Sequence, residues 1–362
     1  MSRRVDQWVP AAHRGDAIGD STLLMRDALR SWGYASEVYA FSQDPGVSVA
    51  PFDSWREGNP HDIVIFHYAV ISPMNDAFRN LRCHRVLQHH NTTPPHFFAP
   101  WDPEIYKILD QARRGLSELA PFTTLGLGDS EFNRAELERS GFTRTGVLPI
   151  AIDFNRYLPP GNAILRKRLT DARTNILFVG RIAPNKRHDH LLRVVAYFKK
   201  NISNAVRLLA VGKHPRRETG NGAPIEAHYL DSLIRLYSEL GLEPADVVFT
   251  DGVSHDDLLA CYESAQVFVS MSEHEGFGVP LVEAMLKRLP IIAYAGTAVK
   301  ETLGGAGLRF DDQDIAGFAE AAALLSRPSV AREAILAGQD RRVKDFEPAK
   351  TLGKLRAWIG EL

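Results

Sequence analysis

Two glutamates that flank a glycine-rich turn are the residues whose spacing suggests chemistry most strongly. Glu275 and Glu283 are separated by seven residues, and Gly276 and Gly278 lie between them. Glycine lets a backbone turn sharply and approach a ligand closely. A carboxylate accepts hydrogen bonds from hydroxyl groups, so the pattern suits a ligand that is rich in hydroxyls.

The elements around this turn predict a second kind of contact. The apolar run Val267–Val269 predicts a short buried strand, and Pro280 suits the first position of a helix. The free N–H groups at a helix start favour an anion such as phosphate. A sugar linked to a nucleoside diphosphate offers both hydroxyls and phosphate. For this turn alone, a strand–helix connection with two solvated glutamates is the simpler interpretation.

A second stretch shifts that balance. A buried strand, Ile176–Val179, ends at Gly180, and the cations Arg181 and Lys186 follow. A guanidinium pairs with phosphate through two parallel hydrogen bonds, and an ammonium adds a point charge. The alternative is two solvated cations, but the helix macrodipole disfavours positive charge at a helix start. An anion is therefore expected nearby.

With both stretches in place, the chain resembles the family 4 glycosyltransferases with the GT-B fold. The resemblance rests on Glu-x7-Glu with the surrounding Gly-Phe-Gly-x-Pro, and on a strand followed by Gly-Arg-x4-Lys. It extends over the whole chain and is strongest over Val147–Phe310. It implies two doubly wound Rossmann-like domains that face each other across a cleft, with a C-terminal helix that crosses back. The implied domains are an acceptor-side domain, a nucleotide-sugar domain and that helix, at residues 1–155, 156–345 and 346–362.

The order of the predicted elements independently favours an α/β fold. Short apolar strands alternate with amphipathic helices in both halves, which is typical of a parallel, doubly wound sheet. The stretch Asp153–Gly161 contains Pro159-Pro160-Gly161 and predicts the crossing between the domains.

The resemblance assigns roles to the residues of the second half. Arg181 and Lys186 resemble a diphosphate clamp, Glu283 the glutamate that binds ribose, and Glu275 the one that contacts the transferred sugar. Further donor contacts through the backbone are implied at Gly180, Phe277, Gly278 and Val279.

The first loop departs from the family pattern. The family carries a glycine pair there, whereas Gly15 is followed by Asp16. Gly15 still lets the loop approach the diphosphate. The Asp16 carboxylate would be repelled by that diphosphate, so we place it toward the acceptor or solvent.

Three histidines follow predicted strands of the first half, where ligands of open α/β sheets bind. His90 is the first choice for a catalytic residue near the reacting sugar. His89 is the alternate, because only one of the two neighbours points into the cleft in extended backbone. His67 is a weaker candidate on the acceptor side, since a lone histidine at a strand end is more often a structural donor.

No metal or other cofactor is expected. Asp312-Gln313-Asp314 matches the Asp-x-Asp motif of metal-dependent glycosyltransferases of another fold. The stretch precedes a predicted helix, and such residues are common at helix starts, so we interpret it as structural.

Composition limits the class of protein. A length of 362 residues suits two domains, and a net charge of −1 gives no electrostatic case for nucleic acid. Cys83 and Cys261 are expected to be buried thiols in a reducing cytoplasm. We expect neither a signal peptide nor a membrane span. Family members with lipid-linked acceptors often lie at the inner face of the cytoplasmic membrane, so weak peripheral contact is an open alternative.

These observations and the resemblance lead to the hypothesis of a retaining, metal-independent hexosyltransferase of the kind used in bacterial polysaccharide synthesis. It would move mannose, the favoured sugar, from a nucleotide-diphosphate sugar to a hydroxyl of a glycan or lipid-linked acceptor. The alternatives are a glucosyltransferase that uses UDP-glucose and a non-catalytic nucleotide-sugar-binding module. A nicotinamide dehydrogenase is disfavoured, because Gly15-Asp16-Ala17-Ile18-Gly19 stands where Gly-x-Gly-x-x-Gly is required.

Overall fold

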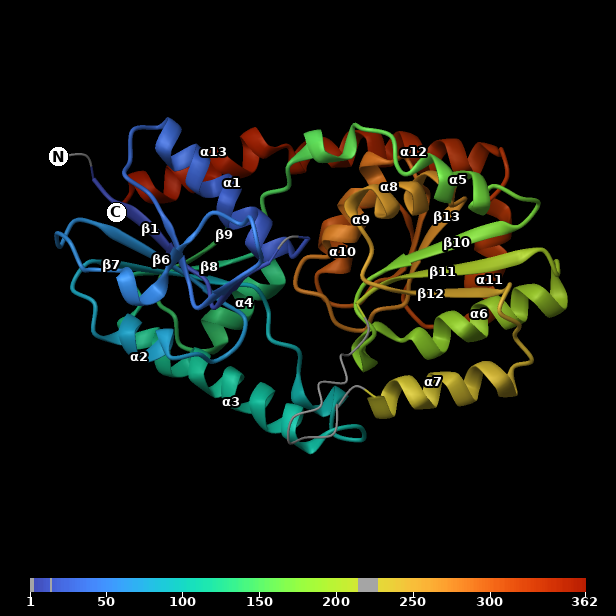
Figure 1. Ribbon diagram of the computed structural model, residues 1–362, viewed down its shortest axis with the longest axis horizontal. Coiled ribbons are helices and arrows are strands. Elements are labelled where there is room, and N and C mark those ends of the chain that lie inside the picture. The colour runs from blue at the N-terminus through green and yellow to red at the C-terminus, as the bar shows by residue number, and fades with distance from the viewer. Residues whose placement is uncertain (1–2, 14, 214–226) are drawn as a thin grey trace. The chain divides into compact units, whose positions relative to one another are not determined.

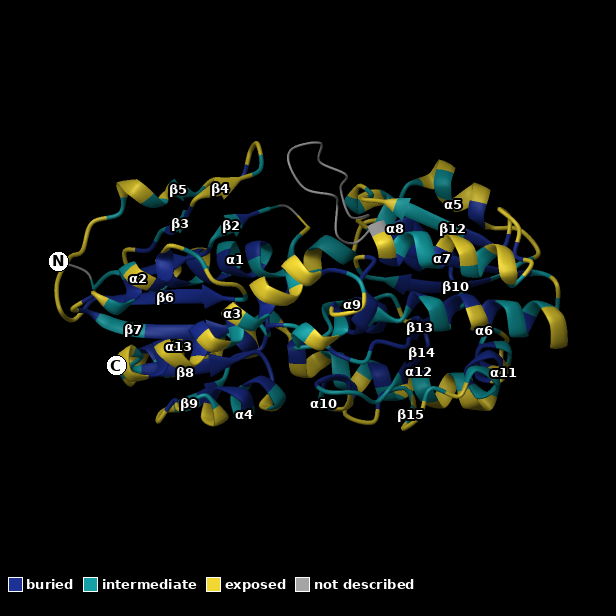
Figure 2. Ribbon diagram, turned by 90° about the horizontal axis from the view of Figure 1, so that it is seen from below, coloured by how far each residue is buried: buried dark blue, intermediate teal, exposed yellow. Residues whose placement is uncertain are grey.

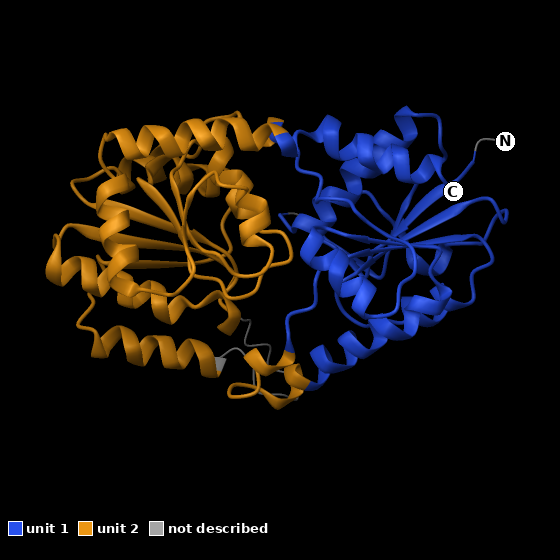
Figure 3. Cartoon of the chain, turned by 180° about the vertical axis from the view of Figure 1, so that it is seen from behind, with its two compact units in different colours: residues 1–94, 107–154, 345–362 blue, residues 95–106, 155–344 orange. Residues whose placement is uncertain are grey.

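The computed structural model describes residues 3–13, 15–213 and 227–362 (Figure 1). The chain divides into two compact units (Figure 3). Unit 1 comprises Met1–Pro94, Lys107–Phe154 and Asp345–Leu362, and unit 2 comprises Pro95–Tyr106 and Asn155–Lys344. Each unit is a parallel sheet with helices on both faces. The predicted fold class, two doubly wound Rossmann-like domains, is confirmed.

The sheet of unit 1 has seven strands in the order β5-β3-β1-β6-β7-β8-β9. Its central strand β6 is buried at all six residues, as expected for a parallel strand covered on both faces (Figure 2). The chain leaves β1 toward β3 and β5, then returns to β6 on the other side of β1, which makes a topological switch point between β1 and β6. The strands are β1 (Val5–Trp8), β3 (Val38–Ala40), β5 (Ala50–Pro51), β6 (Ile63–Tyr68), β7 (His84–His89), β8 (Leu125–Gly128) and β9 (Thr145–Val147), with a separate pair β2 (Ala11–Ala12) and β4 (Ser42–Gln43).

Helices cover both faces of this sheet. The C-terminal helix belongs to unit 1, where Leu355 and Ile359 are buried in the same apolar cluster as Val5. The Trp358 indole N–H donates to the Val147 carbonyl at 3.4 Å. The helices are α1 (Ala17–Ser31), α2 (Met74–Arg79), α3 (Pro103–Leu119), α4 (Glu131–Arg139) and α13 (Pro348–Gly360).

The sheet of unit 2 has six strands in the order β12-β11-β10-β13-β14-β15. The chain leaves β10 toward β11 and β12 and returns to β13 beside β10, so the switch point lies between β10 and β13. The strands are β10 (Thr174–Val179), β11 (Val206–Gly212), β12 (Val247–Asp251), β13 (Val267–Ser270), β14 (Ile291–Tyr294) and β15 (Leu308–Phe310).

The helices of unit 2 bury their apolar faces on this sheet. Leu191, Val195 and Phe318 belong to its main apolar cluster, which also contains the strand residues Ile176 and Val267. The helices are α5 (Ala163–Leu169), α6 (His188–Asn201), α7 (Ala227–Glu239), α8 (His255–Ser264), α9 (Val279–Leu286), α10 (Val299–Leu303), α11 (Ile315–Leu325) and α12 (Val330–Arg342). Within the described residues, no helix has the length and apolarity that crossing a bilayer requires.

The compact units differ from the expected domains in one stretch, and the expected domain bounds stay a prediction. The stretch Pro95–Tyr106 falls within the predicted first domain, residues 1–155, but it packs with unit 2. The Trp101 ring lies 5.2 Å from the Tyr229 ring in an edge-to-face arrangement, and Phe97 lies 6.1 Å from His274. Aromatic contacts therefore hold this stretch on unit 2, although its neighbours in sequence belong to unit 1.

Candidate active site

The switch point of unit 2 brings the two sequence motifs together. Strands β10 and β13 pair in parallel, with Ile176 opposite Val267. The loop that contains Gly180 and Lys186 follows the carboxyl end of β10, and the loop that contains Glu275 follows that of β13. Ligands of open α/β sheets bind at this kind of position.

A direct ion pair joins the two motifs. Lys186 Nζ lies 2.6 Å from Glu275 Oε1, and the two side chains are only 17% and 18% exposed. Arg181, the other expected clamp residue, is exposed. The structure thus pairs the carboxylate expected to bind sugar with one of the two cations expected to bind diphosphate.

Arg187 is a charged residue of this region that the sequence analysis missed. Its guanidinium pairs with the Asp189 carboxylate at 2.9 Å, contacts Glu273 and donates to Gln313 Oε1 at 3.2 Å. Burial alone would lower the pKa of Arg187, but the two carboxylates raise it. The side chain therefore remains charged and ties the loop after β10 to the loop after β13. Spacing in the sequence carries no signal for these contacts.

Backbone contacts fix the loop that carries Glu275. The Glu275 N–H donates to Thr297 Oγ1 at 2.8 Å, and the Thr297 hydroxyl donates to the Glu275 carbonyl at 2.9 Å. The Asn185 side chain donates to the His274 carbonyl at 3.1 Å, and the Glu273 N–H donates to the Asn185 carbonyl at 2.9 Å. Hydrogen bonds from neighbouring loops thus fix both the N–H and the carbonyl of Glu275.

Positive backbone φ angles occur beside several of the candidate site residues. Among the described residues, the non-glycine residues with positive φ are Asn91, Arg187, Arg288 and Thr297, at 71°, 54°, 50° and 44°. Arg187 follows Lys186, Thr297 is bonded to Glu275, and Asn91 follows His90. A positive φ is costly for a β-branched residue such as Thr297, and strain of this kind clusters at functional sites.

Glu283 lies in a separate, buried part of the same region. It is on α9, which begins after Gly278, a glycine at φ 87° that allows the sharp entry into the helix. The Tyr157 hydroxyl donates to Glu283 Oε1 at 2.5 Å and the Tyr262 hydroxyl donates to Oε2 at 2.7 Å. Burial raises the pKa of Glu283, and the two tyrosine hydroxyls oppose that shift. Both carboxylate oxygens thus have a fixed orientation.

The Asp-x-Asp stretch has a local structural task. The Asp314 side chain caps α11 by accepting from the Ala316 N–H at 3.1 Å. Gln313 joins the contacts of Arg187, and its side chain also donates to the Met271 carbonyl at 3.2 Å. In the described ranges there is no cluster of three or more histidine, cysteine or acidic residues suited to a metal.

His67 and His90 form a buried chain with Gln7 and Asp129 at the switch point of unit 1. The Gln7 side-chain amide donates to the Thr22 carbonyl at 2.9 Å, so its oxygen faces His67 Nε2 at 3.0 Å, and that nitrogen carries a proton. Burial, together with the charge of His90, lowers the pKa of His67 well below its ordinary value, so its Nδ1 is unprotonated. This nitrogen accepts from His90 Nε2 at 2.8 Å. His90 Nδ1 also donates, to Asp129 Oδ2 at 2.9 Å.

The His90 ring is held between His67 Nδ1 at 2.8 Å and Asp129 Oδ2 at 2.9 Å. Its side chain is 1% exposed, and both ring nitrogens are engaged by protein. His89 turns the other way and pairs with Glu136 at 2.9 Å in full burial. A catalytic role for His90 and acceptor-side roles for His67 and His89 therefore stay predictions, while the structure gives all three rings a position inside unit 1.

The first loop of unit 1 also has a structural explanation. Asp16 is the N-cap of α1, and its carboxylate accepts from the Gly19 N–H at 3.2 Å. Gly15 before it has φ 72°. The residue that departs from the family's glycine pair thus begins a helix, and its acceptor-side role stays a prediction.

Comparison with known proteins finds a family match inside unit 2. Residues 173–327 match the family described as "Glycosyl transferases group 1". The chain is 33% identical over 198 residues to the D-inositol 3-phosphate glycosyltransferase of Mycobacterium sp. (strain KMS), covering 53% of this chain and 42% of that protein. It is 32% identical over 91 residues to the serotype-specific mannosyltransferase WbdA of Escherichia coli. That match covers 25% of this chain and 11% of WbdA. The matches thus span less than half the length of these relatives.

Solved structures match the fold over nearly the whole chain. HepE from Anabaena, in complex with UDP and glucose, has a TM-score of 0.76 at 16% identity and covers 99% of this chain and 100% of its own. WaaG, a glycosyltransferase involved in lipopolysaccharide biosynthesis, has a TM-score of 0.71 at 15% identity, covering 98% and 99%. Both are similar to this chain in fold.

Proposed function

We propose that the chain is a group 1 glycosyltransferase, also called family 4, as the match over residues 173–327 supports, and that it moves a hexose from a nucleotide-diphosphate sugar to an acceptor hydroxyl. The observation that carries the proposal is the 2.6 Å contact between Lys186 Nζ and Glu275 Oε1. It places a cation suited to diphosphate beside a carboxylate suited to sugar hydroxyls, at the switch point where such sheets bind ligands.

The donor would bind along unit 2. Arg181, Lys186 and the N–H groups at the start of α9 would receive the diphosphate, as helix N-termini favour anions. Glu275 would accept from hydroxyls of the transferred sugar, and Glu283 from the two ribose hydroxyls. Unit 1 would supply the acceptor side.

The chemical step needs little covalent help from the protein. The bond between the anomeric carbon and the diphosphate oxygen breaks, and a bond from that carbon to the acceptor oxygen forms on the same face. The departing diphosphate takes the proton of the acceptor hydroxyl. Negative charge grows on the diphosphate during this step, and preorganised cations at Arg181 and Lys186 would stabilise it without a metal.

Mannose is the favoured sugar and glucose the alternative. The mannosyltransferase WbdA is among the sequence relatives, which supports mannose. HepE, a neighbour in fold, was solved with UDP-glucose, which keeps glucose as the alternative. The acceptor would be a glycan or a lipid-linked glycan, the second of which would bring the protein to a membrane surface.

The test has two stages. A panel of GDP-, UDP- and ADP-sugars is first screened by thermal shift, since a ligand that binds only the folded state raises apparent stability. The stabilising donor is then incubated with candidate acceptors, and release of the nucleoside diphosphate is measured against a donor-only control. Acceptor-dependent release is the expected result. Binding without such release for any acceptor would favour the non-catalytic module, and stabilisation by no nucleotide sugar would refute the proposal.

A further inference from the structure

Glu283 is held by two tyrosine hydroxyls from different parts of unit 2. Tyr157 lies in the short 3₁₀ turn Phe154–Tyr157, at the point where the chain enters unit 2, and Tyr262 lies on α8. Their hydroxyls reach opposite oxygens of one carboxylate, at 2.5 Å and 2.7 Å. Glu283 is 7% exposed and Tyr262 is 1% exposed.

The surroundings of each tyrosine fix its ring. The Tyr157 ring packs edge-to-face on His255 at 5.5 Å, and the His255 Nε2 donates to the Arg156 carbonyl at 2.7 Å. Tyr262 stacks on Phe268 of β13 at 6.3 Å. Both hydroxyls therefore approach Glu283 from rigid supports, so the carboxylate has little freedom to rotate.

The number of lone pairs gives this arrangement a consequence for binding. A carboxylate has two oxygens and about four acceptor positions. The tyrosines occupy one position on each oxygen and leave one on each. Two vicinal hydroxyls are the donors that match one remaining acceptor on each of two adjacent oxygens.

We propose that Tyr157 and Tyr262 are positioning residues that orient Glu283 to accept from both hydroxyls of the donor's ribose. The inference rests on the proposed function, because it assumes that a nucleoside diphosphate binds unit 2. It adds that selection of a ribonucleotide over a deoxyribonucleotide depends on these two phenols. A tyrosine pair that served stability alone would affect both nucleotides equally.

The experiment compares one nucleoside diphosphate with its 2′-deoxy form by calorimetry. UDP, GDP and ADP are tried first, and the one that wild type binds most tightly is used with dUDP, dGDP or dADP. Loss of one hydrogen bond to a charged acceptor corresponds to roughly a tenfold change in affinity, so wild type should prefer the ribonucleotide by about that factor. Tyr157→Phe and Tyr262→Phe should each reduce this preference severalfold.

Tyr197→Phe is the matched control, because the Tyr197 hydroxyl also donates to a glutamate, Glu320, at 3.4 Å within unit 2. It should leave the preference unchanged. If Tyr157→Phe and Tyr262→Phe weaken both nucleotides by the same factor, the pair is structural and the inference is wrong. If Tyr262→Phe does not fold, Tyr157→Phe decides, because that side chain is only partly buried.

Failure of the proposed function would look different. Wild type that binds none of the three nucleoside diphosphates would refute the donor site itself, and the tyrosine inference with it. Wild type that binds one of them but does not distinguish ribose from deoxyribose would remove Glu283 from the ribose and overturn the inference, while leaving Lys186 and Glu275 as the diphosphate and sugar contacts.

Discussion

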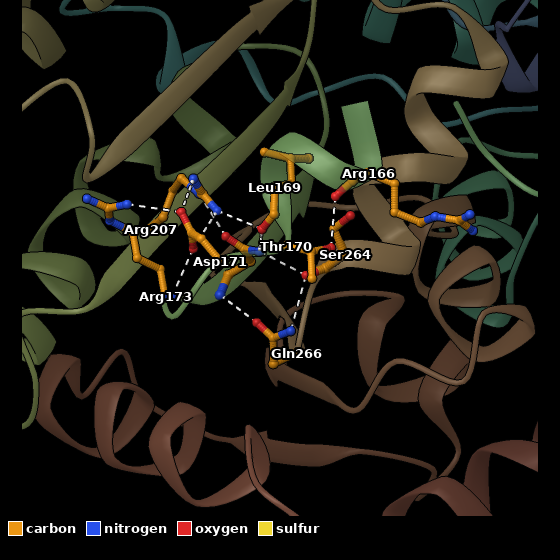
Figure 4. Close-up of polar contacts among 9 residues, drawn as sticks. Arg166, Leu169, Thr170, Asp171, Arg173, Arg207, Ser264 and Gln266 are labelled. Carbon is orange, nitrogen blue, oxygen red and sulfur yellow. Dashed lines mark hydrogen bonds and ion pairs between the residues drawn. The ribbon is translucent and has the colours of Figure 1, made fainter. Parts of the chain in front are cut away.

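Two polar clusters lie at opposite ends of the same strands of unit 2, and they are built differently. The amino-end cluster consists of Asp171, Asn175, Arg207 and Gln266 with the carbonyls of Leu169 and Ser264, and Figure 4 shows its polar contacts. The carboxyl-end site consists of Lys186, Arg187, Glu273, Glu275 and Glu283. Both are rich in charge, but only the second lies where open α/β sheets bind ligands.

The groups of the amino-end cluster bond mainly to one another. Arg207 donates to Asn175 Oδ1 and to the Leu169 carbonyl at 2.8 Å each, and to both oxygens of Asp171 at 3.2 Å. The Asn175 amide donates to the Leu169 and Ser264 carbonyls at 2.9 Å and 2.8 Å. Such a cluster fastens β10, β11 and the end of α8 together.

The carboxyl-end site combines strained backbone with an ion pair whose two charged groups could each bind a ligand. Arg187 and the neighbouring Thr297 have positive φ, and the Asn185 side-chain oxygen is buried without a hydrogen-bond partner. The Lys186–Glu275 pair joins two groups that each suit a different part of a nucleotide sugar. The comparison teaches that polar density alone does not mark a site; strain and position at the strand ends do.

The largest effect is expected from breaking the amino-end cluster. Arg207→Met leaves Asn175 Oδ1 without a donor and removes one of the donors to Asp171 and to the Leu169 carbonyl, so it should lower the free energy of unfolding by about 3 kcal/mol. Denaturant unfolding measures this change. Nucleotide affinity of the folded protein should remain close to that of wild type.

Arg173→Met is the control for this change. Arg173 also contacts Asp171, at 3.0 Å, but both side chains are about one-third exposed. Its loss should cost less than about 1 kcal/mol. Equal destabilisation by the two substitutions would contradict the view that burial of Arg207 gives the cluster its strength.

The corresponding substitution in the carboxyl-end site is Lys186→Ala, which removes the cation paired with Glu275. Removing a preorganised charge that meets developing negative charge typically costs about a hundredfold or more in rate, so single-turnover transfer at saturating donor should fall by about that factor. Circular dichroism should show an intact fold. Lys200→Ala, at an exposed position of α6, is the control. A near wild-type rate for Lys186→Ala would refute the diphosphate clamp.

Substitutions at Thr297 should have a smaller effect on the transfer rate, and they distinguish the role of its backbone strain from that of its hydroxyl. Thr297→Gly accepts φ 44° without strain but lacks the hydroxyl that bonds both backbone groups of Glu275, so transfer should slow by about tenfold, the value of one hydrogen bond of about 1.4 kcal/mol. Thr297→Ser keeps the hydroxyl and should stay near the wild-type rate. If serine and glycine are equally slow, the hydroxyl does not position Glu275.

The contributions of Asp171 and Glu283 to folding stability should also change with pH in opposite directions. Burial would raise the pKa of Asp171, but its hydrogen bonds and the charge of Arg207 hold it below its ordinary value of 3.8. Its stabilising contribution is therefore present above that pH and is lost as pH falls through the lower folded value. Glu283 has a pKa raised above 4.5 by burial, so its contribution is present below 4.5 and is lost as pH rises through the folded value.

Unfolding measured across acidic to neutral pH tests these signs. The stability of wild type relative to Asp171→Asn should increase with pH, whereas its stability relative to Glu283→Gln should decrease. Two differences of the same sign would contradict the contrast between the clusters.

No effect is expected from removing metals. Arg181 and Lys186 would supply the positive charge that a metal brings elsewhere, and Asp314 is engaged as a helix cap. Transfer in EDTA and by Asp314→Ala should match the untreated wild type, provided that α11 stays folded. Loss of activity in EDTA that magnesium or manganese restores would reopen Asp312 and Asp314 as metal ligands.

Local patterns in the sequence were enough to predict two parallel, doubly wound sheets. Residues Ile63–Phe66 and Val267–Val269 are continuous apolar runs, and such runs predict buried parallel strands wherever the chain carries them. Pro95–Tyr106 escaped this reasoning, because Phe97 and Trp101 are bound to unit 2 by ring contacts that leave no periodic signal. The role of Arg187 was not predicted either, because no sequence pattern marks an arginine whose backbone adopts a positive φ.

The sequence by itself determined which groups this protein has for chemistry: a cation six residues after Gly180, and two carboxylates around a glycine turn, one before the predicted helix start and one within that helix. Only the tertiary structure decided what these groups touch. Lys186 meets Glu275 across 89 residues, and Tyr157 meets Glu283 across 126. The physical reason is that local spacing fixes where a strand ends, whereas the order of strands in the sheet fixes which ends become neighbours. Hydrogen bonds between side chains then follow from that order.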